Sequence, residues 1–295
     1  MNKRLNIKQR DLRNAMLFIS PWIVGTLVFK LYPILASFYY SLTDYSVVNP
    51  PVYVGLDNYA SLFHDPLFYQ SLANTLYMGV FGTALTTAFA ILIAVLLNNR
   101  KLKGLSFLRV VFFLPTLVPV VIIGILWIWL LQADNGVINT LLSYIGIDGP
   151  AWLADPSWAK PSFILMMLWS SGGAMIIYIA GLQEIPESLY ESAAIDGAGF
   201  LRQTLSITLP LLSPVILFNV VTLVINVFQW FAEPLIMTSG GPDNATLFYS
   251  LNLFRNAFQY FKMGYASAMA WILLLIAMVI ILILFKLNKK FGHIE

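Results

Sequence analysis

Six long apolar runs constrain the fold of this chain more than any other feature of its sequence. A helix needs roughly twenty predominantly apolar residues to cross the hydrocarbon core of a bilayer, and each run reaches that length. The runs lie near residues 15–40, 72–97, 107–131, 161–183, 211–232 and 265–287. Charged residues make up only 11% of the chain, against roughly a quarter in soluble domains. The sequence therefore predicts an all-α membrane protein with six transmembrane helices in one domain, residues 1–295.

The positions of lysine and arginine predict the orientation, because basic residues stay on the cytoplasmic side of short flanking loops. They gather in the two tails and between the second and third runs: Lys3, Arg4, Lys8, Arg10, Arg13, Arg100, Lys101, Lys103, Arg109, Lys286, Lys289 and Lys290. The other connections are acidic: Asp44, Asp57, Asp65, Asp134, Asp148, Asp155, Glu233 and Asp243. We therefore expect both termini, and the loop between the fourth and fifth runs, in the cytoplasm. The first run is too long for a cleaved signal, so we expect it to be retained.

Composition excludes several function classes. The chain has no cysteine and two histidines, which excludes a disulfide framework, a thiol nucleophile and cysteine-based metal sites. His64 and His293 both lie outside the apolar runs, and no cluster of His, Asp or Glu stands at membrane depth, as a membrane-embedded enzyme would need. The chain also lacks the G-x-x-x-x-G-K-[ST] phosphate loop. Any ATP-driven work must therefore come from another chain.

The loop at residues 185–210 is polar between apolar runs and predicts a cytoplasmic hairpin of two short helices. Pro186 suits the first turn of a helix, and Glu187 favours the positive end of its dipole. Gly197 is placed to stop that helix in a left-handed cap. A second short helix is expected from about residue 198 to 209, ending at Pro210, which opens the fifth run.

The first helix of this hairpin has a small-residue face beside an acidic face. The small face holds Tyr190, Ala193, Ala194 and Gly197, and the polar face holds Glu184, Glu187, Ser188 and Glu191. Small residues allow a close approach of another backbone, which favours a knob that docks into a basic cleft. An amphipathic hairpin lying on the membrane surface accounts for the same pattern, and these physical features alone leave both readings open.

A polar stripe runs along the fifth apolar segment. Asn219, Thr222, Asn226, Gln229, Trp230 and Glu233 fall within an arc of roughly 120° at 100° per residue. In the fourth run, Trp169, Ser170, Ser171, Gly172 and Gly173 bring an aromatic ring and hydroxyls to similar depth. Amides, hydroxyls and an indole face suit a neutral, hydroxyl-rich solute, which predicts a translocation path. Hydrogen bonding between helices is the structural alternative.

Prolines and tryptophans in these runs carry structural predictions. Pro115 and Pro119 should bend the third helix, since each removes a backbone hydrogen bond. The tryptophans near the expected outer surface are predicted to anchor the helices at the membrane interface: Trp127, Trp129, Trp152 and Trp158. The segment GGPDNAT in the last outer loop reads as a cluster of turns.

The spacing within residues 191–210 resembles a known motif. Glu191, Ser192, Ala193, Gly197, Ile207, Leu209 and Pro210 match the coupling-loop ("EAA") motif of permease subunits in bacterial binding-protein-dependent ABC importers. Ser192 departs from the usual alanine. Further segments resemble the carbohydrate-uptake branch with the maltose and glycerol-3-phosphate permeases: VGLDNYASLFHDPLFYQSLANTL, FFLPTLVPVV, AGLQEIPESLYESAAIDGAG and TSGGPDNAT. The resemblance implies the six-helix type I (MetI-like) permease fold, and for Pro115 and Pro119 it adds a role in gating.

The resemblance also implies site residues. The hairpin at 185–210 would sit in a cleft of a cytoplasmic ATPase, with the contact made by Glu191, Ala193, Asp196, Gly197 and Ala198. By similarity to the sugar-binding permease of the maltose system, Ser170, Gly173, Asn226 and Trp230 fall at or next to a transmembrane sugar site. With the polar stripe, the expected substrate path comprises Ser170, Gly173, Asn219, Asn226, Gln229 and Trp230.

The expected function is therefore that of a permease subunit, without ATPase activity of its own, in an ATP-driven importer of an oligosaccharide or a related polyol or glycoside. The resemblance implies two copies of an ATPase subunit that use ATP and Mg, a second permease, expected to be a different chain, and an extracytoplasmic solute-binding protein that meets the GGPDNAT loop. It also implies a location in the bacterial inner membrane. The alternative is an ion-coupled secondary carrier, which would be expected to show acidic residues in mid-span and internal repeats.

Overall fold

The computed structural model describes residues 7–98 and 103–291, and these residues form two compact units. The first unit contains residues up to His64 together with Phe254–Ile272, and the second contains Asp65–Leu253 and the chain from Leu273 onward. Of the basic and histidine residues considered above, Lys3, Arg4, Arg100, Lys101 and His293 lie outside the described residues.

The first unit combines a long N-terminal helix with a small hairpin and part of the C-terminal helix. Its elements are α1 (Ile7–Thr26), the π-helical turn η1 (Leu27–Leu31), α2 (Tyr32–Ser41), β1 (Thr43–Ser46), β2 (Asn49–Tyr53), α3 (Asp57–His64), the π-helical turn η5 (Arg255–Gln259) and the start of α16 (Met263–Phe291). The antiparallel β1–β2 hairpin pairs Thr43 with Tyr53. This hairpin was not predicted from the sequence, because two short strands around adjacent prolines carry little periodic signal.

Side-chain hydrogen bonds fix the turn that follows α2. The amide of Asn58 donates to the carbonyls of Ser41 and Thr43, at 2.9 and 2.8 Å. The Tyr59 hydroxyl donates to the Ser41 hydroxyl at 2.8 Å. Gly264 lies so close to the Thr43 carbonyl that a Cβ there would clash with it. The end of α2 and the start of α16 are therefore held together at one corner of this unit.

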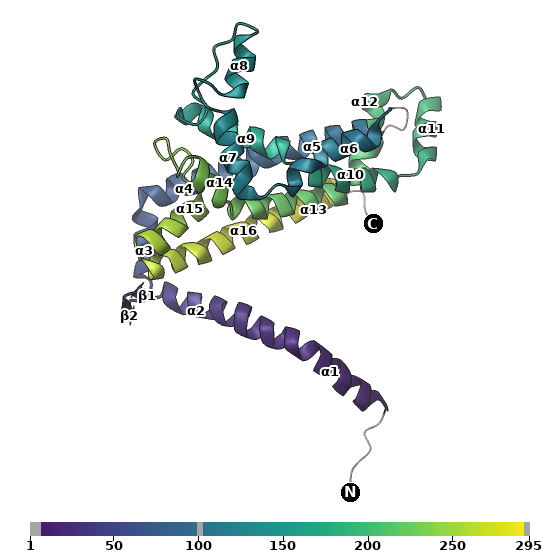
Figure 1. Ribbon diagram of the computed structural model, residues 1–295. Helices are drawn as coiled ribbons and strands as arrows, with labels where there is room; N and C mark the ends of the chain where they lie inside the picture. The colour runs from purple at the N-terminus through teal and green to yellow at the C-terminus, as the bar shows by residue number, and fades with distance from the viewer. Residues whose placement is uncertain (1–6, 99–102, 292–295) are drawn as a thin grey trace. The chain divides into compact units, whose positions relative to one another are not determined.

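The second unit is a helical bundle. Its elements are α4 (Pro66–Tyr77), the π-helical turn η2 (Met78–Gly82), α5 (Thr83–Asn98), α6 (Leu105–Phe113), the 3-10 turn η3 (Leu114–Leu117), α7 (Val120–Leu130), α8 (Val137–Ser143), α9 (Pro156–Trp169), α10 (Gly172–Gln183), α11 (Glu187–Ile195), α12 (Phe200–Gln203), the π-helical turn η4 (Thr204–Thr208), α13 (Leu209–Phe228), α14 (Ala232–Met237) and α15 (Tyr249–Phe254), which ends at the border of the first unit, and the rest of α16. Helices α5, α10 and α13 pack against one another (Figure 1).

All six predicted spans are present as helices, but two of them are broken. Four continuous helices are long and apolar enough to cross a membrane: Asp11–Ser41, Pro66–Asn98, Phe200–Phe228 and Met263–Asn288. The third and fourth spans are bent pairs, Leu105–Leu117 with Val120–Leu130 and Pro156–Trp169 with Gly172–Gln183. The prediction of six helical spans is confirmed when each bent pair counts as one span.

The bend in the third span is confirmed and is sharper than a simple kink. The two halves meet at 104°. Pro115 lies in the 3-10 turn, and Pro119 caps α7 with an extended ψ of 139°. Two missing N–H donors within five residues cannot be compensated by one α-helical ladder, so the helix stops and restarts. The fourth span bends by 48° at its break.

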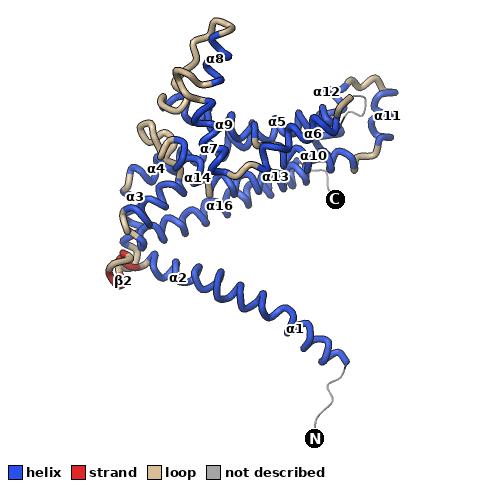
Figure 2. The backbone as a smooth tube through the Cα atoms, viewed as in Figure 1, coloured by secondary structure: helices blue, strands red, loops and turns tan. Residues whose placement is uncertain are grey.

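The predicted helix boundary at Pro210 is wrong. One continuous helix runs from Phe200 to Phe228, and the π-helical turn η4 ends at Thr208, two residues before the proline. A proline within a helix removes a hydrogen bond and crowds the carbonyl four residues earlier. The wider π turn relieves this crowding without ending the helix. The second arm of the hairpin is therefore the first part of the fifth span (Figure 2).

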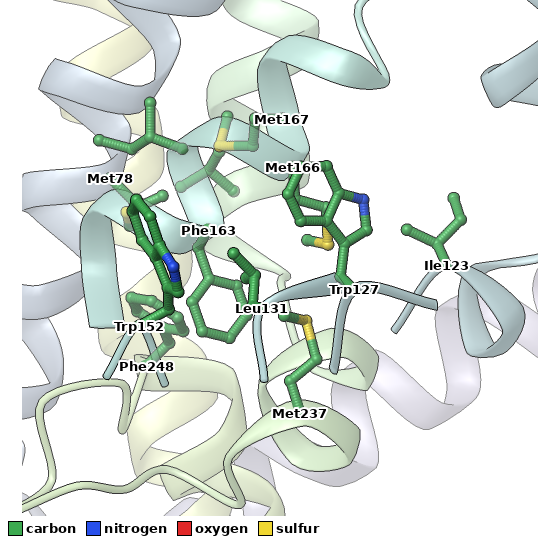
Figure 3. Close-up of a cluster of buried hydrophobic side chains, with 12 residues drawn as sticks. Met78, Ile123, Trp127, Leu131, Trp152, Phe163, Met166, Met167, Met237 and Phe248 are labelled. Carbon is green, nitrogen blue, oxygen red and sulfur yellow. The ribbon is translucent and has the colours of Figure 1, made fainter. Parts of the chain in front are cut away.

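Two of the four predicted interface tryptophans are buried instead. Trp127 is 6% exposed and Trp152 is 7% exposed, and both pack in a cluster with Met78, Phe163 and Phe248 (Figure 3). The Trp152 indole donates to the side-chain oxygen of Asn139 at 2.6 Å. Trp129 and Trp158 are exposed, at 59% and 42%. Trp127 lies in α7, which is apolar on every side, and composition alone does not distinguish the inner from the outer face of such a helix.

Candidate functional site

A central cavity of about 560 Å³ lies in the second unit, where the two broken spans meet α5 and α13. Its lining includes Pro115, Thr116 and Val118 from the break in the third span, and Ser170 and Ser171 from the break in the fourth. Non-helical backbone at membrane depth is tolerated where it is buried in protein or lines a cavity. Both breaks therefore open onto the same space, whose volume is typical of small-molecule sites.

The close approach of the two breaks depends on a glycine. A Cβ at Gly172 would lie in severe conflict with the Phe112 carbonyl and 2.9 Å from the Phe113 Cα. These are backbone atoms, so no side chain can move aside to relieve the contact. A residue without a Cβ is required for the start of α10 to lie against the end of α6.

Five of the six members of the predicted polar stripe line the cavity: Asn219, Thr222, Asn226, Trp230 and Glu233. Gln229 does not. Helix α13 ends at Phe228, and Gln229 adopts ψ 8° as its C-cap, so the 100° rotation per residue no longer applies beyond that point. Gln229 is exposed. The geometry thus separates Gln229 from the other predicted path residues.

The side chains of the stripe differ in how far they are already hydrogen-bonded. Asn219 donates to the Val215 carbonyl at 3.0 Å, and Thr222 donates to the Phe218 carbonyl at 2.9 Å. Asn226 is exposed and lines the cavity, and its side chain forms no hydrogen bond with any other described residue. Its amide is therefore available to a molecule in the cavity as both donor and acceptor.

In the fourth span, Ser170 and Ser171 line the cavity but Gly173 does not. A Cβ at Gly173 would make only an ordinary contact, 3.7 Å from the Thr116 Cγ2. Gly173 therefore lies next to the cavity wall, within the packing between the two breaks.

Trp230 is held in place by two aromatic neighbours. Its ring stacks on Phe248 with centroids 5.5 Å apart, and meets Phe163 edge-on at 5.2 Å. These contacts fix the indole while the residue also lines the cavity. Glu233 lies beyond the end of the fifth span, where burial raises the pKa of its carboxyl above the usual value and a hydrogen bond from Trp230 opposes that rise.

Several cavity residues were not predicted from the sequence, among them the hydroxyl residues Thr86, Thr87 and Tyr178. Thr86 and Thr87 belong to α5, and Tyr178 belongs to α10. The sequence does contain one sign of a polar cavity wall here, which is the pair of adjacent threonines within an otherwise apolar run. Threonine is common in apolar helices, because its hydroxyl can bond to the preceding turn, so the pattern did not stand out.

The hairpin predicted at residues 185–210 is present as α11 and α12 (Figure 1). Helix α11 ends at Ile195, and Gly197 follows with φ +75°. The Gly197 N–H donates to the Ala194 carbonyl, and the Ala198 N–H donates to the Ala193 carbonyl, at 3.0 and 2.8 Å. These two bonds form a Schellman motif. The predicted left-handed cap at Gly197 is confirmed.

The hairpin presents both acidic and apolar side chains to solvent. Glu191 and Asp196 are exposed, as is Gly197, while Ala193 and Ala198 are half-buried. Ile195 is 87% exposed and Leu201 is 74% exposed. Tyr190 departs from the predicted small face, because its hydroxyl bonds to that of Thr208 at 2.9 Å and joins the two arms. Exposed apolar side chains such as these suit contact with a partner protein or with the membrane surface.

The predicted turn cluster GGPDNAT is confirmed, and hydrogen bonds join this loop to α4. Ser239, Gly240, Asp243 and Asn244 all have positive φ. The Asn74 amide donates to the carbonyls of Asn244 and Leu247, at 2.8 and 3.2 Å. The Gln70 amide donates to the Asp243 carbonyl at 3.1 Å. The loop is therefore a defined surface, positioned by side chains one helical turn apart.

The family described as "Binding-protein-dependent transport system inner membrane component" matches residues 62–292, which include the cavity and the hairpin. The chain belongs to this family. It is the permease subunit of an ABC importer and an inner-membrane protein, and ATP hydrolysis in such importers belongs to a separate subunit. Among residues 7–98 and 103–291, no group of three His, Cys, Asp or Glu side chains could hold a metal ion.

Similar proteins support this membership along the whole permease. The probable ABC transporter permease protein YesP of Bacillus subtilis (strain 168) is 42% identical over 300 residues, covering 100% of this chain and 96% of that protein. The lactose transport system permease protein LacF of Rhizobium radiobacter is 37% identical over 274 residues, covering 90% and 91%. A chain of the bacterial alginate ABC transporter, solved with its alginate-bound periplasmic protein, matches with TM-score 0.83 at 27% identity, covering 97% of both chains.

Proposed function

We propose that this permease carries a neutral oligosaccharide, or a related glycoside or polyol, through the central cavity. The observation that carries the proposal is the chemistry of the cavity wall: Asn226 and Ser170 offer uncommitted polar groups beside the fixed indole of Trp230. Amides and hydroxyls match sugar hydroxyls, and an indole face matches the apolar face of a sugar ring. Similar permeases are named for lactose, diacetylchitobiose and arabinooligosaccharides.

The cavity favours a neutral sugar over an acidic one. The solved neighbours belong to an importer of the acidic polysaccharide alginate. In this permease the described residues that line the cavity include no lysine or arginine, and Glu233 is acidic. A carboxylated sugar would enter a low-dielectric space without a cationic partner, which is unfavourable.

We infer that the hairpin transmits the action of ATP to the cavity. The complex would contain two copies of a cytoplasmic ATPase that bind ATP and Mg, and one of them would receive Glu191, Ala193, Asp196, Gly197 and Ala198 of this permease. The helix Phe200–Phe228 runs without interruption from the hairpin to Asn226. A displacement of the hairpin would therefore be passed directly along a rigid element to the cavity wall, which supports alternating access.

The remaining partners follow from the two faces of the permease. We infer that a second permease, a different chain, completes the pathway, and that a solute-binding protein docks on the outer loop that Gln70 and Asn74 position. In this arrangement both termini and the hairpin are cytoplasmic. The solved neighbour crystallised with its periplasmic binding protein is consistent with this arrangement.

Reconstituted transport tests the substrate class. The cognate binding protein is first screened for thermal stabilisation by lactose, diacetylchitobiose, arabinooligosaccharides and alginate oligosaccharides. The stabilising sugar is then tritium-labelled, and its uptake is measured in proteoliposomes containing both permeases and the ATPase. We expect ATP-dependent uptake of a neutral sugar. Uptake of alginate oligosaccharides alone would contradict the neutral class, and uptake driven by an ion gradient without ATP would favour the secondary carrier.

Reversing one charge tests the coupling surface. Because Glu191 is exposed and its side chain makes no hydrogen bond with a described residue, Glu191→Lys should leave the fold intact. We expect the variant to insert normally, to lose sugar-stimulated ATP hydrolysis and to retain the ATPase poorly in detergent. Stimulated hydrolysis and uptake at the wild-type level would contradict the assignment of this hairpin.

A further inference from the structure

Two buried hydroxyls in the wall of the cavity have no hydrogen-bond partner. They are the Thr86 hydroxyl on α5 and the Tyr178 hydroxyl on α10, and both residues line the cavity. Thr86 is 3% exposed and Tyr178 is fully buried. Tyr178 lies near Thr87 without forming a hydrogen bond of ordinary geometry. Buried polar groups without partners are rare in native proteins, and each requires a physical explanation.

Two other helical threonines of this permease show how such a hydroxyl can be satisfied locally. Thr75, which is also buried, donates to the Ser71 carbonyl at 2.9 Å, and Thr204 donates to the Phe200 carbonyl at 2.9 Å. Thr86 would need the Gly82 carbonyl, but Gly82 ends the π-helical turn η2. A π-helical turn shifts the carbonyls away from the α-helical ladder, and such turns are frequent at functional sites. The local backbone therefore leaves this hydroxyl free for another partner.

The position of the two hydroxyls suggests what that partner is. Helix α10 leads from the break at Ser170 and Ser171 towards the hairpin, so Tyr178 lies deeper than the serines along the expected route. A solute that moves from Ser170 and Asn226 towards the hairpin would pass Tyr178, and Thr86 lines the same cavity. Their hydroxyls can each donate to and accept from a sugar hydroxyl.

We propose that Thr86 and Tyr178, on the facing helices α5 and α10, form an inner sugar-binding site that is closed in this structure and receives the sugar as it leaves Ser170 and Asn226. This inference rests on the proposed transport of a hydroxyl-rich solute. The site opens when α5 and α10 separate at this level, and the sugar then supplies the hydrogen bonds that the closed wall lacks. The energetic cost of the unpaired hydroxyls in the closed state favours that opening.

Conservative variants test the proposal against a purely structural explanation. Tyr178→Phe and Thr86→Val remove one hydroxyl each and keep the shape. If the hydroxyls are merely unsatisfied, their removal should raise or preserve the melting temperature and leave uptake unchanged, because apolar replacement of an unpaired buried group is neutral or stabilising. If they bind sugar, we expect the maximal uptake rate per complex to fall about fivefold, the rate equivalent of one hydrogen bond, without a loss of thermal stability.

Thr83→Val is the matched control. Thr83 lies on the same helix, is 3% exposed and also has an unpartnered hydroxyl, but it lines a separate apolar groove and not the cavity. This variant should transport like the wild type, and Thr86→Ser, which retains the hydroxyl, should restore most of the uptake lost in Thr86→Val. Wild-type rates in Tyr178→Phe and Thr86→Val, or an equal loss in Thr83→Val, would overturn the proposal.

The choice of probe keeps this test separate from the proposed function. Uptake is measured with the tritium-labelled sugar that drives the wild-type complex in the reconstitution described above. If the wild-type complex moves no sugar with ATP, the proposed function fails. If it moves sugar and the variants match it, only the inner site fails.

Discussion

At the scale of single residues, two glycines of this permease are required for different physical reasons. Gly197 has φ +75°, and a Cβ there would meet nothing within 4 Å, so its requirement is conformational. Gly172 has an ordinary φ, and a Cβ there would collide with the backbone at Phe112, so its requirement is space. A left-handed conformation disfavours other residues by roughly 1–2 kcal/mol, whereas a backbone clash forces the two segments apart.

Replacing Gly197 should weaken the hairpin without disturbing the bundle. We expect Gly197→Ala to lower sugar-stimulated ATP hydrolysis, because the Schellman cap sets where the second arm starts. Gly199→Ala is the control, since Gly199 has φ −73° and a Cβ there would also meet nothing within 4 Å. Hydrolysis by proteoliposomes measures both. Equal activity in the two variants would show that the left-handed cap is dispensable for coupling.

Cavity residues should affect uptake more than assembly. We expect Asn226→Leu to lower uptake about tenfold. Leucine cannot hydrogen-bond, so a sugar hydroxyl at this place in the cavity would be left without its partner. Trp230→Ala should act in the same direction. Gln229→Leu is the control, since Gln229 lies in the same predicted stripe but outside the cavity wall. Uptake at the wild-type rate in Asn226→Leu and Trp230→Ala would return the stripe to a structural role.

At the scale of elements, the cavity exists because two spans are broken at the same level. The third span breaks between Leu117 and Val120, and the fourth between Trp169 and Gly172. Each break frees backbone groups and tilts the following half-helix away from the axis of the preceding one. The fifth span is continuous instead, which lets it connect the hairpin with the cavity.

Two adjacent glycines test how closely the broken spans must pack. We expect Gly172→Ala to destabilise the purified permease by about 3 kcal/mol or more, because overpacking against backbone cannot be relieved by rotamer changes. Gly173→Ala should be nearly neutral, since a Cβ there would make an ordinary contact. Thermal unfolding in mild detergent compares them. Similar melting temperatures for both variants would contradict the close approach of α10 to Phe112.

Hydrophobic length and turn chemistry made much of this architecture predictable. The six spans, the proline break and the Gly197 cap each depend on a local rule. The π-helical turn before Pro210 was not predictable, because it depends on whether the surrounding bundle favours continuing the helix. The burial of Trp127 and the access of Thr86 to the cavity depend on which face of an apolar helix turns inward. Only the packing of neighbouring spans decides that face.

At the scale of the whole molecule, the predicted orientation can be tested with minimal background. The permease contains no cysteine, so a single introduced cysteine is the only thiol. We expect Ser192→Cys, on the exposed hairpin, to react with a membrane-impermeant maleimide only in inverted vesicles. Asp134→Cys, on the exposed loop after α7, should react only in right-side-out cells. The reverse pattern would invert the topology and place the hairpin out of reach of a cytoplasmic ATPase.

The measurement that tests the account most directly is affinity purification of this permease from native membranes in mild detergent, with its partners identified by mass spectrometry. We predict recovery of an ATPase subunit, a second and different permease and a solute-binding protein, with the ATPase lost from Glu191→Lys. Recovery of the permease alone, in a preparation that preserves other membrane complexes, would contradict coupling to a separate ATPase.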